Sequence, residues 1–431
     1  MCKLPRKIRS KAIQKLLLLA ENGNGPAKFM LRHMGADVLN LGFQSVGAAI
    51  SPPEPFVVAK LSTGVDWMNT GDGTLIWKEA AHDIPVKTPF VIGRSYDPIE
   101  TKVISNTAYV CELKNVTVFS KSNIVLTSDN FAIDDIGADH RFGSYVSHHI
   151  DKAVLAQHGQ NLLMNPSNFR VKEIEIGIML SGAASGEFGH WVPEFLPKLQ
   201  YYEHHPDFSR IPLIIDENMP QSHFDYLNCV APNHVSIKLK PGDALKCQTL
   251  LYAPTVTFFP THLRANTQSP FDVGPVSPRS YEFLKRKIEA KFGAPAPQGR
   301  KIYLTRQNMK WSKISNEAAV ADILRKNGFE VIKIEELTFD GQVEMFQQAA
   351  VIVAAGGSAL QNIIFSHPST RLILLAQNNL HNWGCFNGQV GALGYQPIFV
   401  CGAARGDANS KHSDYETPLA DLEQALLYVD A

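Results

Sequence analysis

The 431-residue sequence lacks a surplus of either charge and lacks an apolar run long enough to cross a bilayer. Lysine plus arginine and aspartate plus glutamate are both 41, so no global basic field favours nucleic acid and no acidic excess indicates a disordered chain. The six cysteines are scattered, without Cys-x-x-Cys or zinc-finger spacing, so neither a disulfide framework nor a zinc site is expected. These absences favour a globular protein of a reducing compartment, long enough for roughly two or three domains.

Local basicity occurs only at the start of the chain, where lysines and arginines precede Leu16-Leu-Leu-Leu-Ala20. This apolar run is too short for a signal peptide or a transmembrane helix. A basic amphipathic helix can rest on an anionic membrane surface, and a solvated helix face explains the same pattern. We therefore expect a soluble, cytoplasmic protein, with peripheral contact to the inner face of the membrane through residues 1–20 as the open alternative.

Two blocks of alternating strand and helix patterns follow a β-rich start. Residues 108–127 predict an antiparallel sheet, and alternation begins at Glu173 and again at Lys301 after a linker rich in proline and glycine at residues 266–280. The sequence thus predicts an α/β fold in which two Rossmann-like domains face each other across a cleft, with an N-terminal β-rich extension. The expected boundaries are 1–107 for the poorly defined extension, 108–275 and 276–415 for the two domains, and 416–431 for a closing helix.

The segment Val351–Asn362 predicts a strand, a tight turn and a helix that begins near Ser358. Gly356 and Gly357 allow close approach of an anion to the backbone, and a helix start offers unpaired N–H groups and a positive dipole end. An ordinary strand-to-helix turn is the alternative. Arg306 follows another predicted strand, where a guanidinium can take a phosphate in two parallel hydrogen bonds. Together they indicate a phosphate site.

Further polar residues lie near this predicted site. Lys313 can add a cation, and a solvated loop lysine is the favoured alternative. Glu317 and Gln342 stand at helix starts, where capping by Ser315 or Asn316 and compensation of the helix dipole explain them without a ligand. Glu335 and Glu336 follow a strand where an acidic residue often binds ribose, and solvated turn charges are the alternative.

His190 and Glu194 lie one turn apart in a helix predicted over His190–His204, directly after a loop of small residues. Histidine can take a proton from a hydroxyl near neutral pH, and a neighbouring carboxylate can orient it. A hydrogen-bonded histidine at a capped helix start is the alternative. A second polar cluster has no spacing that dictates metal geometry, so no metal site is expected there; it comprises Asp134, Asp135, Asp139, His140, His148 and His149.

Several of these motifs occur in an order that resembles glycosyltransferase family 61. The resemblance covers residues 108–400. Its motifs are Asn115-Val-Thr-Val-Phe119, His190-Trp191 with Glu194, Leu196 and Pro197, Tyr303-Leu-Thr-Arg306, Lys313-Ile-Ser-Asn-Glu317, Asp340-Gly-Gln342 to Phe346, and Gly356-Gly-Ser-Ala-Leu-Gln-Asn362. Departures are Gly356 where many relatives have histidine, Ala359 in place of glycine, and Lys313 in place of arginine.

The resemblance implies a GT-B type, inverting and metal-independent glycosyltransferase with no cofactor beyond its nucleotide-sugar donor. Its partners would be that donor and a glycan or lipid-linked acceptor, in surface or capsular polysaccharide synthesis. Residues 108–275 would bind the acceptor, with His190 as the base and Glu194 beside it. Residues 276–415 would bind the donor through Arg306, Lys313, Glu317, Gln342, Gly356, Gly357, Ser358, Ala359 and Asn362. The alternative is a non-catalytic carbohydrate-binding or scaffold protein that keeps this fold.

Overall fold

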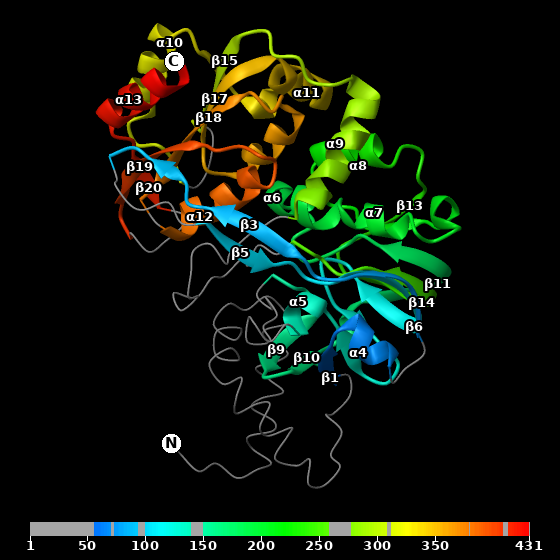
Figure 1. The fold of residues 1–431 in the computed structure, drawn as a ribbon. Coiled ribbons are helices and arrows are strands. Elements are labelled where there is room, and N and C mark those ends of the chain that lie inside the picture. The colour runs from blue at the N-terminus through cyan, green and yellow to red at the C-terminus, as the bar shows by residue number, and fades with distance from the viewer. Residues whose placement is uncertain are drawn as a thin grey trace, which may run out of the picture.

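The computed structural model describes residues 56–69, 73–93, 100–138, 150–257, 277–307, 312–378, 380–407 and 413–430. These ranges form a mixed α/β protein with two large sheets, each partly parallel (Figure 1). The basic segment at residues 1–20 and most of the predicted linker lie outside the described residues. In the described ranges, no helix combines the length and apolar character needed to cross a membrane.

The first sheet has 11 strands among the described residues, and ten follow the order β13-β12-β11-β14-β6-β7-β8-β1-β10-β9, with β2 paired to β6. The strands β13, β12, β11 and β14 are parallel, whereas β6 runs antiparallel to β14 and β7. The antiparallel sheet predicted at residues 108–127 is confirmed by the pairing of β6 with β7, and β6 is a single strand of 12 residues. The bounds are β1 Val57–Ser62, β2 Gly73–Glu79, β6 Ala108–Phe119, β7 Val125–Leu126, β8 Phe131–Ile133, β9 Val154–His158, β10 Asn161–Met164, β11 Arg170–Met179, β12 Leu213–Asp216, β13 Ser236–Leu239 and β14 Asp243–Tyr252.

Helices accompany this sheet, and one of them differs from the sequence prediction. The continuous helix expected over His190–His204 is wrong: a short α-helix, a π-helical turn and a second α-helix follow one another, since Pro193 and Pro197 have no N–H for the helical ladder. The bounds are α4 Gly64–Met68, α5 Asp135–Ala138, η2 Pro166–Asn168, α6 Phe188–His190, η3 Trp191–Phe195, α7 Lys198–Tyr202, η4 Phe208–Arg210 and α8 Gln221–Val230.

The second sheet has the strand order β16-β15-β17-β18-β19-β20, and β4 also pairs with β19. Neighbours from β16 to β19 are parallel, and β20 is antiparallel to β19. The alternation predicted from Lys301 onward is therefore confirmed as a parallel α/β unit. The bounds are α9 Pro278–Phe292, β15 Arg300–Leu304, α10 Glu317–Lys326, β16 Glu330–Ile332, η5 Ile334–Glu336, α11 Phe339–Gln348, β17 Ala349–Ala355, η6 Ser358–Phe365, β18 Arg371–Gln377, α12 Leu380–Gly391, β19 Ile398–Arg405, β20 Asp414–Glu416 and α13 Leu419–Asp430.

Residues assigned to the N-terminal extension contribute strands to both sheets. The strands β1 and β2 belong to the first sheet, while β4 (Phe90–Val91) pairs in parallel with β19 of the second. A ribbon of β3 (Asp83–Lys87) and β5 (Glu100–Ile104) runs toward α12 and β19 (Figure 1). Nδ2 of Asn387 on α12 donates to the carbonyl of Lys87 at 2.6 Å. The extension therefore ties the two sheets together.

The two α/β units share one apolar core. A single cluster of buried residues extends from β11 and α8 to β15, β17 and η6. At its centre, the ring of Tyr226 stacks on Phe365 at 5.5 Å and meets the edge of Phe339 at 5.2 Å. Because aromatic pairs of this kind are well packed, the two units are joined by side chains from α8, α11 and η6.

Candidate functional site

The second sheet has its topological switch point between β15 and β17. Chain order places β16 on one side of β15, and β17, β18 and β19 successively on the other. In open parallel sheets, ligands bind beyond the carboxyl ends of the strands at such a point. Arg306 follows β15 and Gly356 follows β17, so both predicted anion-binding segments leave the sheet at this position.

Arg306 lies against the glycine turn, which we define as Gly356 and Gly357. Its Nη1 donates to the carbonyl of Gly356 at 3.0 Å, and a Cβ atom at Gly357 would overlap the same nitrogen. The turn leads into η6, which is a 3₁₀-helix where the sequence predicted an ordinary helix start. Ser358 is exposed and Ala359 is half-buried at this start. Close packing of the guanidinium on the turn therefore explains why position 357 is glycine.

The carboxylate of Glu317, which was expected to contact a ligand, points toward β15 instead. It is buried, and its Oε1 accepts from the backbone N–H of Arg306 at 2.6 Å, from Oγ1 of Thr305 at 2.7 Å and from the hydroxyl of Tyr303 at 2.9 Å. A carboxylate with three donors on one oxygen is held firmly. Glu317 therefore fixes the end of β15 and the backbone that presents Arg306.

Gln342 and Asn362 form a pair behind the turn. Nδ2 of Asn362 donates to Oε1 of Gln342 at 2.9 Å, while Nε2 of Gln342 donates to the carbonyls of Ile334 and Leu337. Asn362 is buried, and its Oδ1 has no hydrogen-bond partner within the described part of the chain. The pair links η6 to the loop before α11 and so holds the turn in place.

Lys313 and the helix start after it are tied to β20. Lys313 is exposed; its N–H donates to Asp414, and its carbonyl accepts from the N–H of Tyr415. The capping expected from Asn316 is absent in this helix, because the Asn316 side chain instead makes two hydrogen bonds to the backbone of Thr417. These bonds tie Lys313 and Asn316 to β20 and Thr417, and none of them joins Lys313 to Arg306.

The glycine at position 356 also has a packing reason. A Cβ atom there would overlap the ring of Phe386, which comes from α12 and is half-buried. Phe386 was not predicted as a site residue, because α12 carries three glycines, at 384, 388 and 391, and shows no clear periodicity. The aromatic ring occupies the space into which a side chain at position 356 would project.

In the first unit, buried Asp216 holds the loop of small residues before His190 in place through hydrogen bonds to Gly182 and Ser185. Its carboxylate accepts from the hydroxyl of Ser185 at 2.6 Å and from the backbone N–H groups of Lys121 at 2.8 Å and Gly182 at 3.2 Å. Burial raises the pKa of Asp216, and these donors oppose the rise. Asp216 therefore acts as a support for the loop.

His190 and Glu194 meet as their spacing predicted. Nδ1 of His190 lies 3.1 Å from Oε1 of Glu194, and both side chains are largely buried, with exposed fractions of 18% and 10%. When Nδ1 carries the proton that faces Glu194, Nε2 keeps the lone pair that a base needs. Trp191 to Phe195 form the π-helix, a form found frequently at functional sites.

Behind this pair, Trp191 contacts His223 of α8. Nε1 of Trp191 donates to the carbonyl of His223 at 3.2 Å, and the rings of Trp191 and Phe188 pack on its imidazole. Burial lowers the pKa of His223 to about 4, so its ring is neutral at physiological pH. His223 was not singled out from the sequence, since its neighbours in the fold are 30 or more positions away along the chain.

The two groups of residues are adjacent in space. A Cβ atom at Gly189 would lie 3.4 Å from Cβ of Ser358, so α6 packs directly on the start of η6. In Figure 1, α6 lies where the two α/β units meet. The structure thus brings α6, which ends at His190, against the start of η6, with no side chain at position 189 to separate the two elements.

Other predicted polar positions serve different contacts. Asp135 is half-buried and accepts from the hydroxyls of Tyr109 at 2.6 Å and Tyr252 at 2.8 Å, and Glu336 pairs with Lys333 at 3.2 Å. Asp139, His140, His148 and His149 lie outside the described residues. Within the residues that the structure describes, no group of three acidic, histidine or cysteine side chains is arranged to hold a metal ion.

The fold and this site define an α/β protein with an arginine and a glycine turn at a switch point and a histidine–carboxylate pair beside them. Residues 188–373 match the model of a protein family, Glycosyltransferase 61. The match begins at α6 and ends in β18, so it contains His190, Arg306 and the glycine turn. It supports family 61, and hence a glycosyltransferase, for this part of the chain. The curated proteins gave no match.

Proposed function

We propose that this protein is an inverting glycosyltransferase of GT-B type that moves a sugar from a nucleotide-sugar to a hydroxyl of a glycan acceptor. The observation that supports the proposal is the packing of α6, which ends at His190, on η6, which follows the glycine turn held by Arg306. One unit supplies a base and the other an anion site, as transfer from a sugar diphosphate requires.

His190 takes the proton of the acceptor hydroxyl on Nε2 as the oxygen attacks the anomeric carbon. Glu194 stabilises the resulting imidazolium through Nδ1. The bond from that carbon to the diphosphate oxygen breaks on the opposite face, which inverts the configuration. Arg306 and the backbone N–H groups of residues 357–359 stabilise the departing diphosphate. This cationic support lets us propose transfer without a metal ion.

A binding screen followed by a transfer assay tests the proposal. Thermal shifts with UDP, GDP, CMP and TDP identify the nucleotide, because a ligand of the folded state raises the melting temperature. The matching sugar nucleotide should then be hydrolysed slowly, and nuclear magnetic resonance of a transferred product should show inversion. Product with retained configuration would contradict the mechanism, as would activity abolished by EDTA and restored by manganese.

A non-catalytic carbohydrate-binding protein is the second candidate, and Gly356 with Phe386 favours it. The resemblance sets histidine where Gly356 stands, and the Phe386 ring fills that space. Glycan binding without any nucleotide affinity would establish this candidate and remove the first. We further propose a cytoplasmic role in surface or capsular polysaccharide synthesis, with residues 1–20 as a membrane contact. Liposome binding that is unchanged by their removal would contradict that contact.

A further inference from the structure

Three different elements contact the glycine turn and the residue after it, each at a different position. A Cβ atom at the first glycine would overlap the ring of Phe386 from α12, and one at the second would overlap Nη1 of Arg306. The next residue, Ser358, lies against Gly189 of α6. An aromatic ring, a guanidinium and the helix that ends at the candidate base therefore follow one another along the backbone that leaves β17.

This order corresponds to the three parts of a nucleotide-sugar. Under the proposed function the sugar faces α6, because His190 at the end of α6 has to reach the acceptor hydroxyl at the anomeric carbon. Arg306 and the N–H groups of residues 357–359 hold the diphosphate in the middle. The nucleoside then extends past the other end of the turn, where Phe386 lies.

The ring of Phe386 is only partly covered by the protein. Phe386 is half-buried, and the edge of its ring that contains Cδ2, Cε2 and Cζ faces Gly356. Both glycines of the turn are half-buried as well, and Ser358 after them is exposed. Solvent therefore reaches this end of β17, where open parallel sheets bind ligands. The ring is packed along one edge and keeps an accessible part for a ligand.

Buried amide side chains hold α12 in this position. The hydroxyl of Tyr281 donates to Oε1 of Gln361 at 2.7 Å, and Nε2 of Gln361 donates to Oε1 of Gln389 at 2.9 Å. This chain of hydrogen bonds joins α9, η6 and α12. Gln389 comes three positions after Phe386, so the two side chains lie on the same face of α12. The bond that ties Gln389 to η6 therefore also holds the ring of Phe386 against the glycine turn.

We propose that Phe386 is a donor-binding residue whose ring stacks on the base of the nucleotide. The inference deepens the proposed function and rests on it for the identity of the ligand. Nucleobases stack on aromatic side chains because both have flat π faces, and every base offers such a face. The ring thus adds affinity for a nucleoside diphosphate that a free diphosphate does not gain.

The two side chains that flank the turn would act on different parts of the ligand. Phe386 carries neither a charge nor a hydrogen-bond donor, so its contribution depends on the base and is independent of the phosphates. Arg306 is a cation with several N–H donors, so its contribution depends on the phosphates. A probe that has the diphosphate but lacks the base therefore separates the two residues.

The test titrates the full-length protein with two probes in a calorimeter. One is the nucleoside diphosphate that gives the largest thermal shift, and the other is inorganic pyrophosphate. Phe386→Ala should weaken binding of the nucleoside diphosphate by roughly 10–100-fold, as loss of one stacked base does, and leave pyrophosphate binding unchanged. Phe386→Tyr keeps the ring and should bind both probes as the parent protein does. Arg306→Ala should weaken the binding of both probes.

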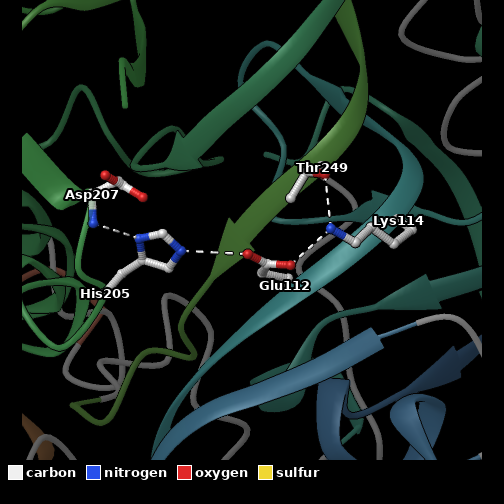
Figure 2. Close-up of polar contacts among 5 residues, drawn as sticks. All are labelled: Glu112, Lys114, His205, Asp207 and Thr249. Carbon is white, nitrogen blue, oxygen red and sulfur yellow. Dashed lines mark hydrogen bonds and ion pairs between the residues drawn. The ribbon is translucent and has the colours of Figure 1, made fainter. Parts of the chain in front are cut away.

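The matched control is Phe208→Ala, which removes another half-buried phenylalanine. Phe208 begins η4 of the first unit, at the amino end of β12, and its ring packs on His234 at 4.7 Å. The turn before it is bound to β6, because His205 and Lys114 both contact the carboxylate of Glu112 (Figure 2). This variant should bind both probes as the parent protein does.

A second measurement detects the stacking directly. In the complex with the nucleoside diphosphate, nuclear magnetic resonance of labelled phenylalanine should show cross-relaxation between the Phe386 ring, assigned from Phe386→Ala, and protons of the base. If Phe386→Ala does not fold, Phe386→Leu takes its place with the same expected selectivity, because leucine keeps apolar volume and lacks the flat ring.

The outcomes separate this inference from the proposed function. Equal losses for both probes, an unchanged affinity for the nucleoside diphosphate, or a base without contact to the ring would each overturn the inference, even if the enzyme transfers sugar. A selective loss in a protein that transfers no sugar would leave the stacking intact and remove the proposed function. A parent protein that binds no nucleoside diphosphate would remove both.

Discussion

The two halves of the candidate site hold their side chains by different means. Around Arg306, contacts are made with main-chain atoms and one carboxylate: the carbonyl of Gly356 and the oxygen of Glu317 fix it. Around His190, buried ionisable groups dominate, among them Glu194, Lys198 and Asp216. Under the proposed function, the half around Arg306 would be a rigid receptor for an anion, and the half around His190 would hold and move protons. Each prediction below tests one side of this contrast.

The largest effect is expected at the proton-handling half. His190→Ala should lower turnover by roughly 10²–10⁴-fold, as removal of a general base does, while nucleotide binding persists. Single-turnover rates and calorimetry with the nucleoside diphosphate measure the two quantities separately. Intact turnover would move the base to another group, of which Glu187 and Glu194 are the nearest along the chain.

At the receptor half, Arg306→Ala should weaken nucleoside diphosphate binding by roughly 10–100-fold, because a charge-assisted hydrogen-bonding group is lost. Arg300→Ala is the matched control, since Arg300 stands at the other end of β15 and pairs with Glu330 at 2.8 Å. Calorimetry should show normal binding in the control. Equal dissociation constants for Arg306→Ala and the parent protein would remove Arg306 from the site.

A smaller effect is expected from Gly356→Ala, which forces its methyl group into Phe386. Overpacking of this kind costs about 1–3 kcal/mol in stability. Phe386→Ala should relieve it, so the double variant should be more stable than the sum of the two single changes. Chemical denaturation of all four proteins gives the coupling, and strict additivity would show that the ring and the turn are independent.

The smallest effect concerns Asp134. Burial raises its pKa to about 7 in the folded protein, above the ordinary value of 3.8, so the fold favours the protonated acid. This stabilisation is present below about pH 4 and is lost as the pH rises through 7. Asp134→Asn removes the loss, and its Tm should exceed that of the parent by about 1–3 °C at pH 8, by less at pH 5 and hardly at all at pH 3.5. A constant difference across this range would contradict the shifted pKa.

Much of the second unit could be predicted because its signals are local. Apolar runs of strand length, followed by arginine or glycine, identify β15, β17 and the turn. The inward orientation of Glu317 could not be predicted, since a helix start looks the same whether its acid faces solvent or a neighbouring strand. The missed helix α12 is held by tertiary contacts, such as Asn387 to Lys87, against the low helix propensity of its three glycines.

The half of the candidate site around His190 was harder to predict for a related reason. The spacing of His190 and Glu194 was visible, and their contact is as expected. Lys198 and Asp134 are 64 positions apart, and whether a lysine is buried depends on distant residues that no periodic pattern reveals. The domain boundaries drawn from the linker stay a prediction, although β4 shows that the early chain contributes to the second sheet.

The pairing of β4 with β19 also constrains how the chain acquires its structure. Lys87, next to β4, leaves the ribosome 300 residues before Asn387, its partner on α12. Contacts of such long sequence separation slow folding, because a large loop must close before they form. The residues of β4 therefore have no β19 to pair with until most of the protein has been synthesised. Completion of the second sheet is then a late event of biosynthesis, and truncation before β19 would leave an early strand without its partner.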